Sequence, residues 1–184
     1  DTGDGQGQFP GAELIRTKFF IPHLHPTLVQ RRRLLALLNL EPLRALSVIC
    51  APAGFGKTTL LSEWAVQSQV PVAWVSLDSG DNDPLRFWRY IIAALETLRP
   101  GFGHQALDLL RLFDARNTNS FLTALLNEIG AWDGQFALVL DDYHKIESPS
   151  LRSSVAVLVE HMPPQMHLMI ASRVLPDLPL ARLR

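Results

Sequence analysis

A lysine and two threonines directly follow two closely spaced glycines in the stretch CAPAGFGKTTLLSEW, residues 50–64. Glycine permits backbone conformations with positive φ, so the chain can curl and turn successive N–H groups toward one anion. Lys57 can then reach the terminal phosphates of a nucleotide as a mobile positive charge, and the Thr58 hydroxyl is suited to ligate Mg²⁺. The spacing indicates a phosphate-binding loop that runs into a helix N-terminus, where the helix dipole also favours an anion.

The loop departs from the common pattern G-x-x-x-x-G-K-[ST] at its first position, where Ala51 stands in place of glycine. Pro52 directly follows and favours an extended backbone at Ala51, a conformation that alanine adopts at little cost. We therefore expect a nucleotide site despite the substitution. The loop residues expected to bind the nucleotide are Ala53, Gly54, Phe55, Gly56, Lys57, Thr58 and Thr59.

Two carboxylates end a later apolar stretch, FALVLDDYH, residues 136–144. Because ligands of open α/β sheets bind at the carboxyl ends of the strands, these groups should face the loop. Asp141 is the expected Mg²⁺ partner of Thr58, and Asp142 is expected to orient or deprotonate the attacking water; the two roles could also be exchanged. His144 could contact a phosphate or serve only in the turn.

A third strand end carries an arginine, in HLMIASR, residues 167–173. Ser172 and Arg173 stand at the same edge of the expected sheet and could reach the γ-phosphate, which would let the protein distinguish ATP from ADP. Lys57, Asp142 and Arg173 are therefore the residues expected to act in catalysis.

Strands and helices alternate along the chain, as βαβ units require. Apolar and β-branched runs predict strands over 44–52, 71–78, 136–143 and 167–173, of which 44–52 and 136–143 are expected to be buried. Helical patterns occur over 25–40, 56–68, 83–98, 105–113, 119–132 and 148–162. This order predicts an α/β protein with the three-layer P-loop NTPase fold, a parallel sheet with helices on both faces. Cys50 is expected to be a buried thiol, and the four tryptophans are expected to be core or interface residues. The acidic run DSGDNDP, residues 78–84, is expected to cap helices.

Composition limits the possible functions. The 184 residues are 47% hydrophobic and 19% charged, which suits one well-buried domain. With 17 Lys and Arg against 18 Asp and Glu, no basic excess would hold a polyanion, so we expect any DNA contact to lie outside this chain. The single cysteine fits a reducing cytoplasm, and no apolar run approaches a membrane span. Residues 1–13 are expected to be a flexible lead-in, and the domain, residues 14–184, to stop before the last strand of its sheet as a fragment of a longer protein.

From about Leu14 to Arg184 the chain resembles the N-terminal ATPase domain of the large ATP-binding LuxR-type transcriptional regulators, which belong to the STAND class of P-loop ATPases. The resemblance rests on RTKFFIPHLHPTLVQRRRLL, APAGFGKTTLLSEW, WVSLDSGDNDPLRFWRYIIAAL, LVLDDYHKI and ASRVLPDLPLARLR, which occur in that order. In that family the loop begins with alanine or a similarly small residue, so Ala51 conforms to the family pattern.

The resemblance also gives the segment before the loop a role. In STAND proteins a hydrophobic-hydrophobic-Gly-Arg-Glu segment lines the adenine side of the nucleotide, and Val29 and Arg31 match its hydrophobic and arginine positions. Gln30 and Arg32 replace the glycine and the glutamate, so the match is partial.

The resemblance implies a switch that binds ATP or ADP together with Mg²⁺. ADP would hold the full protein closed and monomeric, whereas inducer and ATP would favour self-association and transcription activation, with slow hydrolysis as the reset. DNA would be bound by a C-terminal helix-turn-helix outside this chain. The alternative is a P-loop kinase that transfers the γ-phosphoryl group to a small molecule; it would need an arginine-rich lid, and the sequence has no arginine cluster of that kind.

Overall fold

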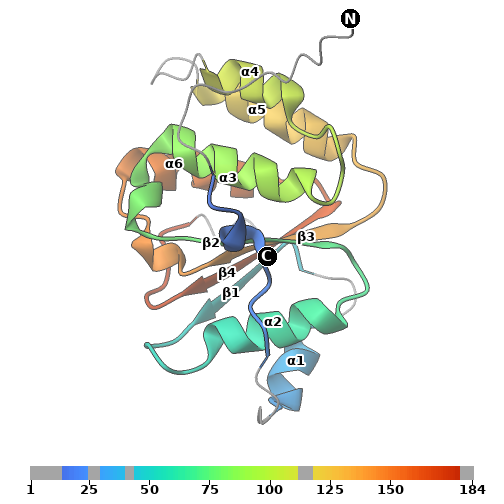
Figure 1. The fold of residues 1–184 in the computed structure, drawn as a ribbon, viewed down its shortest axis with the longest axis vertical. Coiled ribbons are helices and arrows are strands. Elements are labelled where there is room, and N and C mark those ends of the chain that lie inside the picture. The colour runs from blue at the N-terminus through green and yellow to red at the C-terminus, as the bar shows by residue number, and fades with distance from the viewer. Residues whose placement is uncertain (1–13, 25–29, 40–43, 112–117, 179–184) are drawn as a thin grey trace, which may run out of the picture.

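The computed structural model describes residues 14–24, 30–39, 44–111 and 118–178. In this part, four parallel strands form one sheet in the order β1-β4-β3-β2 (Figure 1). The strands are β1 (Leu46–Cys50), β2 (Val72–Ser76), β3 (Phe136–Asp141) and β4 (Met166–Ser172). The predicted parallel sheet is confirmed, and every predicted strand is found close to its expected bounds.

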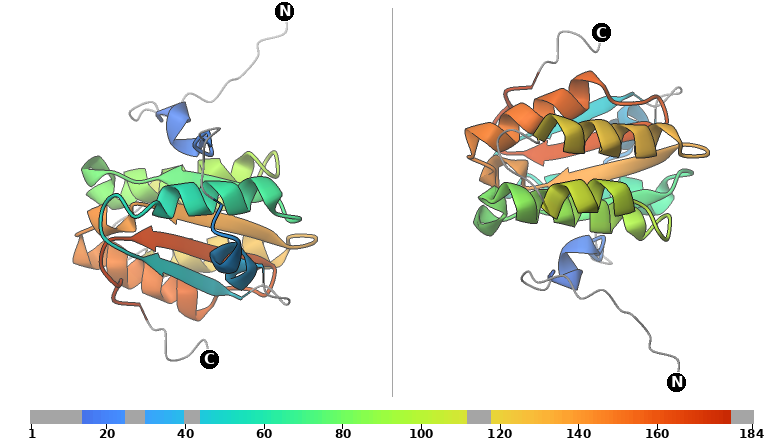
Figure 2. Two further views of the ribbon diagram at one scale, coloured as in Figure 1. Left: turned by 90° about the horizontal axis from the view of Figure 1, so that it is seen from below. Right: turned by 90° about the horizontal axis from the view of Figure 1, so that it is seen from above.

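Helices cover both faces of the sheet, as predicted (Figures 1 and 2). One face is covered by α1 (Arg32–Leu38) and α2 (Lys57–Gln67), and the other by α3 (Pro84–Glu96) and α6 (Pro149–Glu160). The remaining helices, α4 (His104–Arg111) and α5 (Thr118–Gly130), pack on each other as an outer pair over α3 and α6. Of the helix expected over 25–40, residues 25–29 and residue 40 lie outside the described ranges.

Side chains of the two central strands alternate between two cores, because successive residues of a strand point to opposite faces. Leu138 and Ile170 face the larger core under α3, α5 and α6, which also holds Trp88 and Trp132. Val139 faces the smaller core beneath α2. Trp64 and Trp74 lie in this smaller core, so all four tryptophans are buried as expected.

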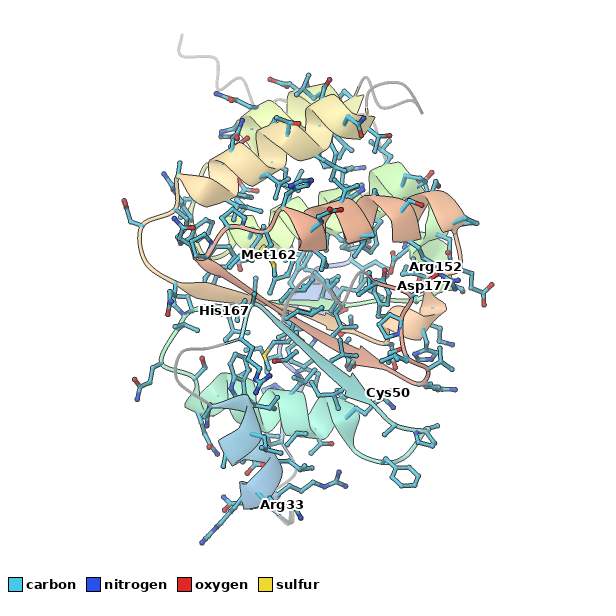
Figure 3. The ribbon with its side chains drawn as sticks, turned by 180° about the vertical axis from the view of Figure 1, so that it is seen from behind. Arg33, Cys50, Arg152, Met162, His167 and Asp177 are labelled. Atoms are coloured by element: carbon cyan, nitrogen blue, oxygen red, sulfur yellow. The ribbon has the colours of Figure 1, made fainter. Side chains whose placement is uncertain are left out.

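Strand β1 differs from the prediction of a buried strand and a buried Cys50. Four of its residues are half-buried and Cys50 is exposed at its end (Figure 3). The reason is position: among the described residues β1 pairs only with β4, so its other side is an edge of the sheet. A short apolar run predicts a strand, but its place in the sheet depends on residues far away in the sequence.

A turn near the N-terminus, η1 (Arg16–Phe19), is fastened to the sheet beside β2 through a buried ion pair. Lys18 donates to Asp81, whose side chain is fully buried, and forms a second ion pair of 2.8 Å with Asp78. Hydrogen bonding to Lys18 keeps the pKa of Asp78 below its ordinary value, against the opposing effect of burial. We call Lys18, Asp78, Asp81 and Arg86, which also contacts Asp81 at 3.1 Å, the N-terminal clasp.

The helix-capping role predicted for residues 78–84 is confirmed. Asp78 accepts a hydrogen bond from the Gly80 N–H and caps the short turn η2 (Ser79–Asn82). Asp83 accepts from the Arg86 N–H and caps α3. In the described part of the chain, no helix combines the length and the apolar character needed to cross a membrane.

Candidate nucleotide-binding site

The carboxyl ends of the strands bring the predicted site residues to one edge of the sheet. Cys50, the last residue of β1, stands opposite Ser172 of β4, and Asp141 of β3 stands opposite Ser76 of β2. The Ala51 N–H donates to the Ser172 carbonyl across 3.2 Å, which fixes the start of the loop beside the end of β4. Loop, carboxylates and Arg173 therefore gather here because the sheet is parallel.

The loop uses its glycines as the sequence suggested. Gly54 and Gly56 have φ values of 79° and 71°, in the left-handed region where a side chain is strained. Gly56 also precedes the first residue of α2, and a Cβ atom there would lie 3.3 Å from the guanidinium of Arg31. Ala53 and Phe55 are exposed on the loop. Thr59 is half-buried in the first turn of α2.

The side chain of Lys57 is buried and crosses the base of the loop. Its Nζ donates to the carbonyl oxygens of Ala51 and Pro52, over 2.8 Å and 3.0 Å. These two neutral acceptors are weaker partners for an ammonium group than a phosphate, because the phosphate oxygens carry negative charge that attracts the ammonium group. A nucleotide phosphate would therefore compete well for this lysine.

Thr58 and Asp141 are in direct contact although 83 residues separate them. The Thr58 hydroxyl donates to one carboxylate oxygen of Asp141 over 2.8 Å, and the Asp142 N–H donates to the other over 2.9 Å. A hydroxyl and a carboxylate are hard oxygen ligands of the kind that Mg²⁺ takes up beside nucleotide phosphates. The two side chains predicted to bind Mg²⁺ thus lie within hydrogen-bonding distance of each other.

Burial is the main cause that raises the pKa of Asp141 above its ordinary value, and the charge of Asp142 adds to it. The hydrogen bond from Thr58 and the charge of Lys57 act in the opposite direction. Since the folded chain then binds more protons than the unfolded chain, stability falls as pH rises from the ordinary pKa through the raised one. Ionisation of this carboxylate therefore lowers the stability of the fold, and a bound cation would reduce that cost.

Replacing Asp141 by asparagine is accordingly expected to stabilise the chain in the absence of Mg²⁺ and nucleotide. Removing a strained functional charge commonly raises the free energy of unfolding by about 0.5–2 kcal/mol, and the asparagine can still bond to Thr58. Thermal melts of the variant and the wild type between pH 4 and pH 7 measure the effect, which should grow with pH. A variant less stable than the wild type at pH 7 would contradict the conclusion that the charge of Asp141 destabilises the fold.

Asp142 lies just beyond β3 with a φ of 57°, and among the described residues it alone combines a side chain with positive φ. Such conformations cost free energy and concentrate at functional sites. The residue starts the short turn η3 (Tyr143–Lys145), and its side chain is 44% exposed. Arg173 follows β4 at the same edge of the sheet and is exposed.

Arg31 approaches the loop from the α1 side. Its Nη1 donates to the Phe55 carbonyl over 2.6 Å, which ties the segment before α1 to the tip of the loop. A groove of about 490 Å³ continues from this contact between α1 and β1. The groove is lined mostly by apolar side chains, including Leu34, Leu37, Leu38, Val48, Phe55 and Leu60. Val29, the other residue matched to the adenine side, lies outside the described residues.

A second, larger hollow of about 840 Å³ lies between α5 and α6. Its lining includes Leu122, Thr123, Val157 and His161 but neither the loop nor the carboxylates. Volume alone would favour this hollow, but the groups that can bind phosphate and Mg²⁺ stand at the carboxyl edge of the sheet. The position of these groups therefore makes the smaller groove and the loop beside it the candidate nucleotide site.

Fold and site together define a P-loop NTPase domain: a parallel α/β sheet, a glycine-rich loop that leads into a helix, and a carboxylate beside the loop threonine. The crystal structure of Cdc6p from Pyrobaculum aerophilum has the same fold, with a TM-score of 0.56 and 16% identity. The match covers 92% of this chain and 46% of that chain. No protein-family model matches the chain.

In sequence, the chain is similar to the HTH-type transcriptional regulators MalT of Cronobacter sakazakii and Yersinia pestis. The identities are 37% and 36% over 171 residues, which is 93% of this chain. The chain is thus homologous to the N-terminal region of these regulators, and the resemblance drawn from its motifs is confirmed. It spans only 19% of the length of these relatives.

Proposed function

We propose that this domain binds ATP and ADP with Mg²⁺ and is the nucleotide-dependent switch of a LuxR-type transcriptional regulator. The observation that carries the proposal is the contact between Thr58 and Asp141 next to the loop that holds Lys57. Lys57 and Thr58 are the first two residues of α2, and Thr58 bonds to Asp141 at the end of β3, which supports a shared role of the three residues. Homology to transcriptional regulators supplies the biological setting.

Each group has a defined task in this proposal. The loop N–H groups and the N-terminus of α2 hold the phosphates, and Lys57 bridges to the outermost ones. Thr58 and Asp141 would hold Mg²⁺, which would supply positive charge next to the phosphates. Asp142 orients the attacking water, and Arg173 responds to the γ-phosphate. The groove beside β1 and Arg31 is the place for the base.

A switch needs contacts that differ between its two states, and the γ-phosphate supplies them. Lys57, Thr58, Asp141 and Arg173 are the groups through which ATP and ADP can be told apart. A coupling of about 1–3 kcal/mol between nucleotide and self-association is typical of such devices. Hydrolysis then resets the switch, and DNA is bound by another part of the regulator, since this chain has no excess of basic residues.

The test is a titration of the chain with fluorescent ADP and ATP, each in the presence of Mg²⁺ and in the presence of a chelator. Both nucleotides should bind. Removal of Mg²⁺ should lower the affinity for ATP by about 10-fold and the affinity for ADP by less. Absence of binding for both nucleotides would refute the proposal. Binding of both without any effect of Mg²⁺ would refute the roles of Thr58 and Asp141.

A further inference from the structure

His144 lies in the turn η3 that Asp142 begins, and its side chain is 11% exposed. Its Nδ1 is 3.7 Å from Oδ1 of Asp142. Both ring nitrogens are covered by protein atoms, and neither has a hydrogen-bond partner in the described part of the chain. A covered imidazole without partners is uncommon, because a buried polar atom that makes no hydrogen bond loses the bonds that water would give it.

The charges around the ring favour its neutral form. Burial lowers the pKa of His144 below its ordinary value, and the positive charges of Arg173, Lys145 and Lys57 act in the same direction. Asp142 alone opposes them among the groups that act on the ring. A neutral imidazole carries one N–H, and the Asp142 carboxylate, 3.7 Å from Nδ1, can accept a hydrogen bond from it.

We propose that His144 is a positioning residue for Asp142: the Nδ1–H of its ring donates to Oδ1 of Asp142 and holds this carboxylate toward the attacking water. The inference rests on the proposed function, in which Asp142 orients that water. It adds a residue that touches neither the nucleotide nor the metal and acts only through Asp142.

The local backbone explains why Asp142 needs such a partner. Its main chain is fixed on both sides, since the Asp142 N–H bonds to the Asp141 side chain and the Lys145 N–H donates to the Asp142 carbonyl over 2.9 Å. The carboxylate itself is 44% exposed and can rotate. Hydrogen bonds in catalytic sites are often long before the substrate binds, and a small side-chain rotation would close the 3.7 Å gap.

Two substitutions separate hydrogen bonding from packing. His144→Phe keeps an aromatic ring at the site and removes both nitrogens, whereas His144→Asn loses volume but keeps an N–H close to the position of Nδ1. Single-turnover ATP hydrolysis by the chain should slow by about 10-fold or more with phenylalanine and recover to within about 3-fold of wild type with asparagine. Nucleotide affinity should stay the same in both. If His144→Asn hydrolyses ATP more slowly than His144→Phe, the ring acts through packing and the proposal is overturned.

A double mutant tests whether His144 acts through Asp142. In the Asp142→Asn background, His144→Phe should cause no further loss of hydrolysis, because the carboxylate it positions is already gone. If the rate of hydrolysis in the double mutant falls by the product of the two single-mutant losses, the two residues act independently and the proposal is overturned.

The pairing can also be measured without any hydrolysis, by following the imidazole resonances of His144 with pH. The titration midpoint should fall by about 0.5–1 pH unit in the Asp142→Asn variant, since a nearby negative charge stabilises the protonated ring. An unchanged midpoint would overturn the pairing even if the domain binds nucleotide. Failure of the wild type to bind nucleotide, with the midpoint shift intact, would instead overturn the proposed function.

Discussion

Replacing Lys57 by alanine abolishes ATP binding, with an expected loss of at least about 100-fold in affinity. Each charge-assisted hydrogen bond from the ammonium group to a phosphate contributes about 1.5–3 kcal/mol, and a 100-fold loss corresponds to about 2.7 kcal/mol. The alanine also leaves the carbonyls of Ala51 and Pro52 without the donor that they have now. Isothermal titration with Mg-ATP and with ADP measures the loss, which should be larger for ATP.

A matched control separates the charge of Lys57 from the packing of its stem. Lys57→Met keeps most of the buried aliphatic chain and removes the ammonium group, so it should melt close to wild type and still fail to bind ATP. Melting curves of both variants show whether the loop and α2 remain folded. Normal ATP binding by the alanine variant would refute the assignment of the phosphate-binding loop.

Replacing Asp142 by asparagine should slow hydrolysis by about 100-fold or more while the affinity for Mg-ATP stays within about 3-fold. The carboxylate acts on the attacking water and contributes little to ground-state binding. Its side chain is 44% exposed, so the substitution should change stability little. Phosphate release under single-turnover conditions, with protein in excess over ATP, measures the rate even when turnover is slow.

The neighbouring carboxylate provides the comparison for this experiment. Asp141→Asn should lose the Mg²⁺ dependence of ATP binding, which Asp142→Asn should keep. If the effects of the two substitutions are exchanged, then Asp142 is the Mg²⁺ partner and Asp141 acts on the water. Unchanged hydrolysis in the Asp142 variant would place the catalytic role elsewhere.

Local signals in the sequence were enough to predict the loop. The spacing of Gly54, Gly56 and Lys57 sets a backbone path that nearby residues decide, and the structure shows that path. The meeting of Thr58 with Asp141 could be predicted as well, because the parallel arrangement places all strand ends at one edge.

Contacts between distant side chains could not be predicted in the same way. The hydrogen bond of Arg31 to the Phe55 carbonyl depends on how α1 packs against the loop, and no local pattern encodes that packing. The half-exposed state of β1 depends on the order of strands in the sheet, which its own residues do not specify. The acidic residues 78–84 gave a correct signal for capping but no sign of Lys18, which is 63 residues away from Asp81.

The N-terminal clasp sets a limit on how far the chain can be shortened from its start. A version that begins after Phe19 would lose Lys18, the partner of an Asp81 carboxylate that is fully buried in the intact chain, and would keep the ion pair with Arg86. Removing one partner of a buried ion pair costs about 3–5 kcal/mol, a large share of the stability of a small domain. Tyr90 would also lose the Ile15 N–H that donates to its hydroxyl and the ring of Phe19 that packs against it. The turn before the first helix is thus as much a part of the folding unit as the phosphate-binding loop, although it stands far from the nucleotide chemistry in the sequence.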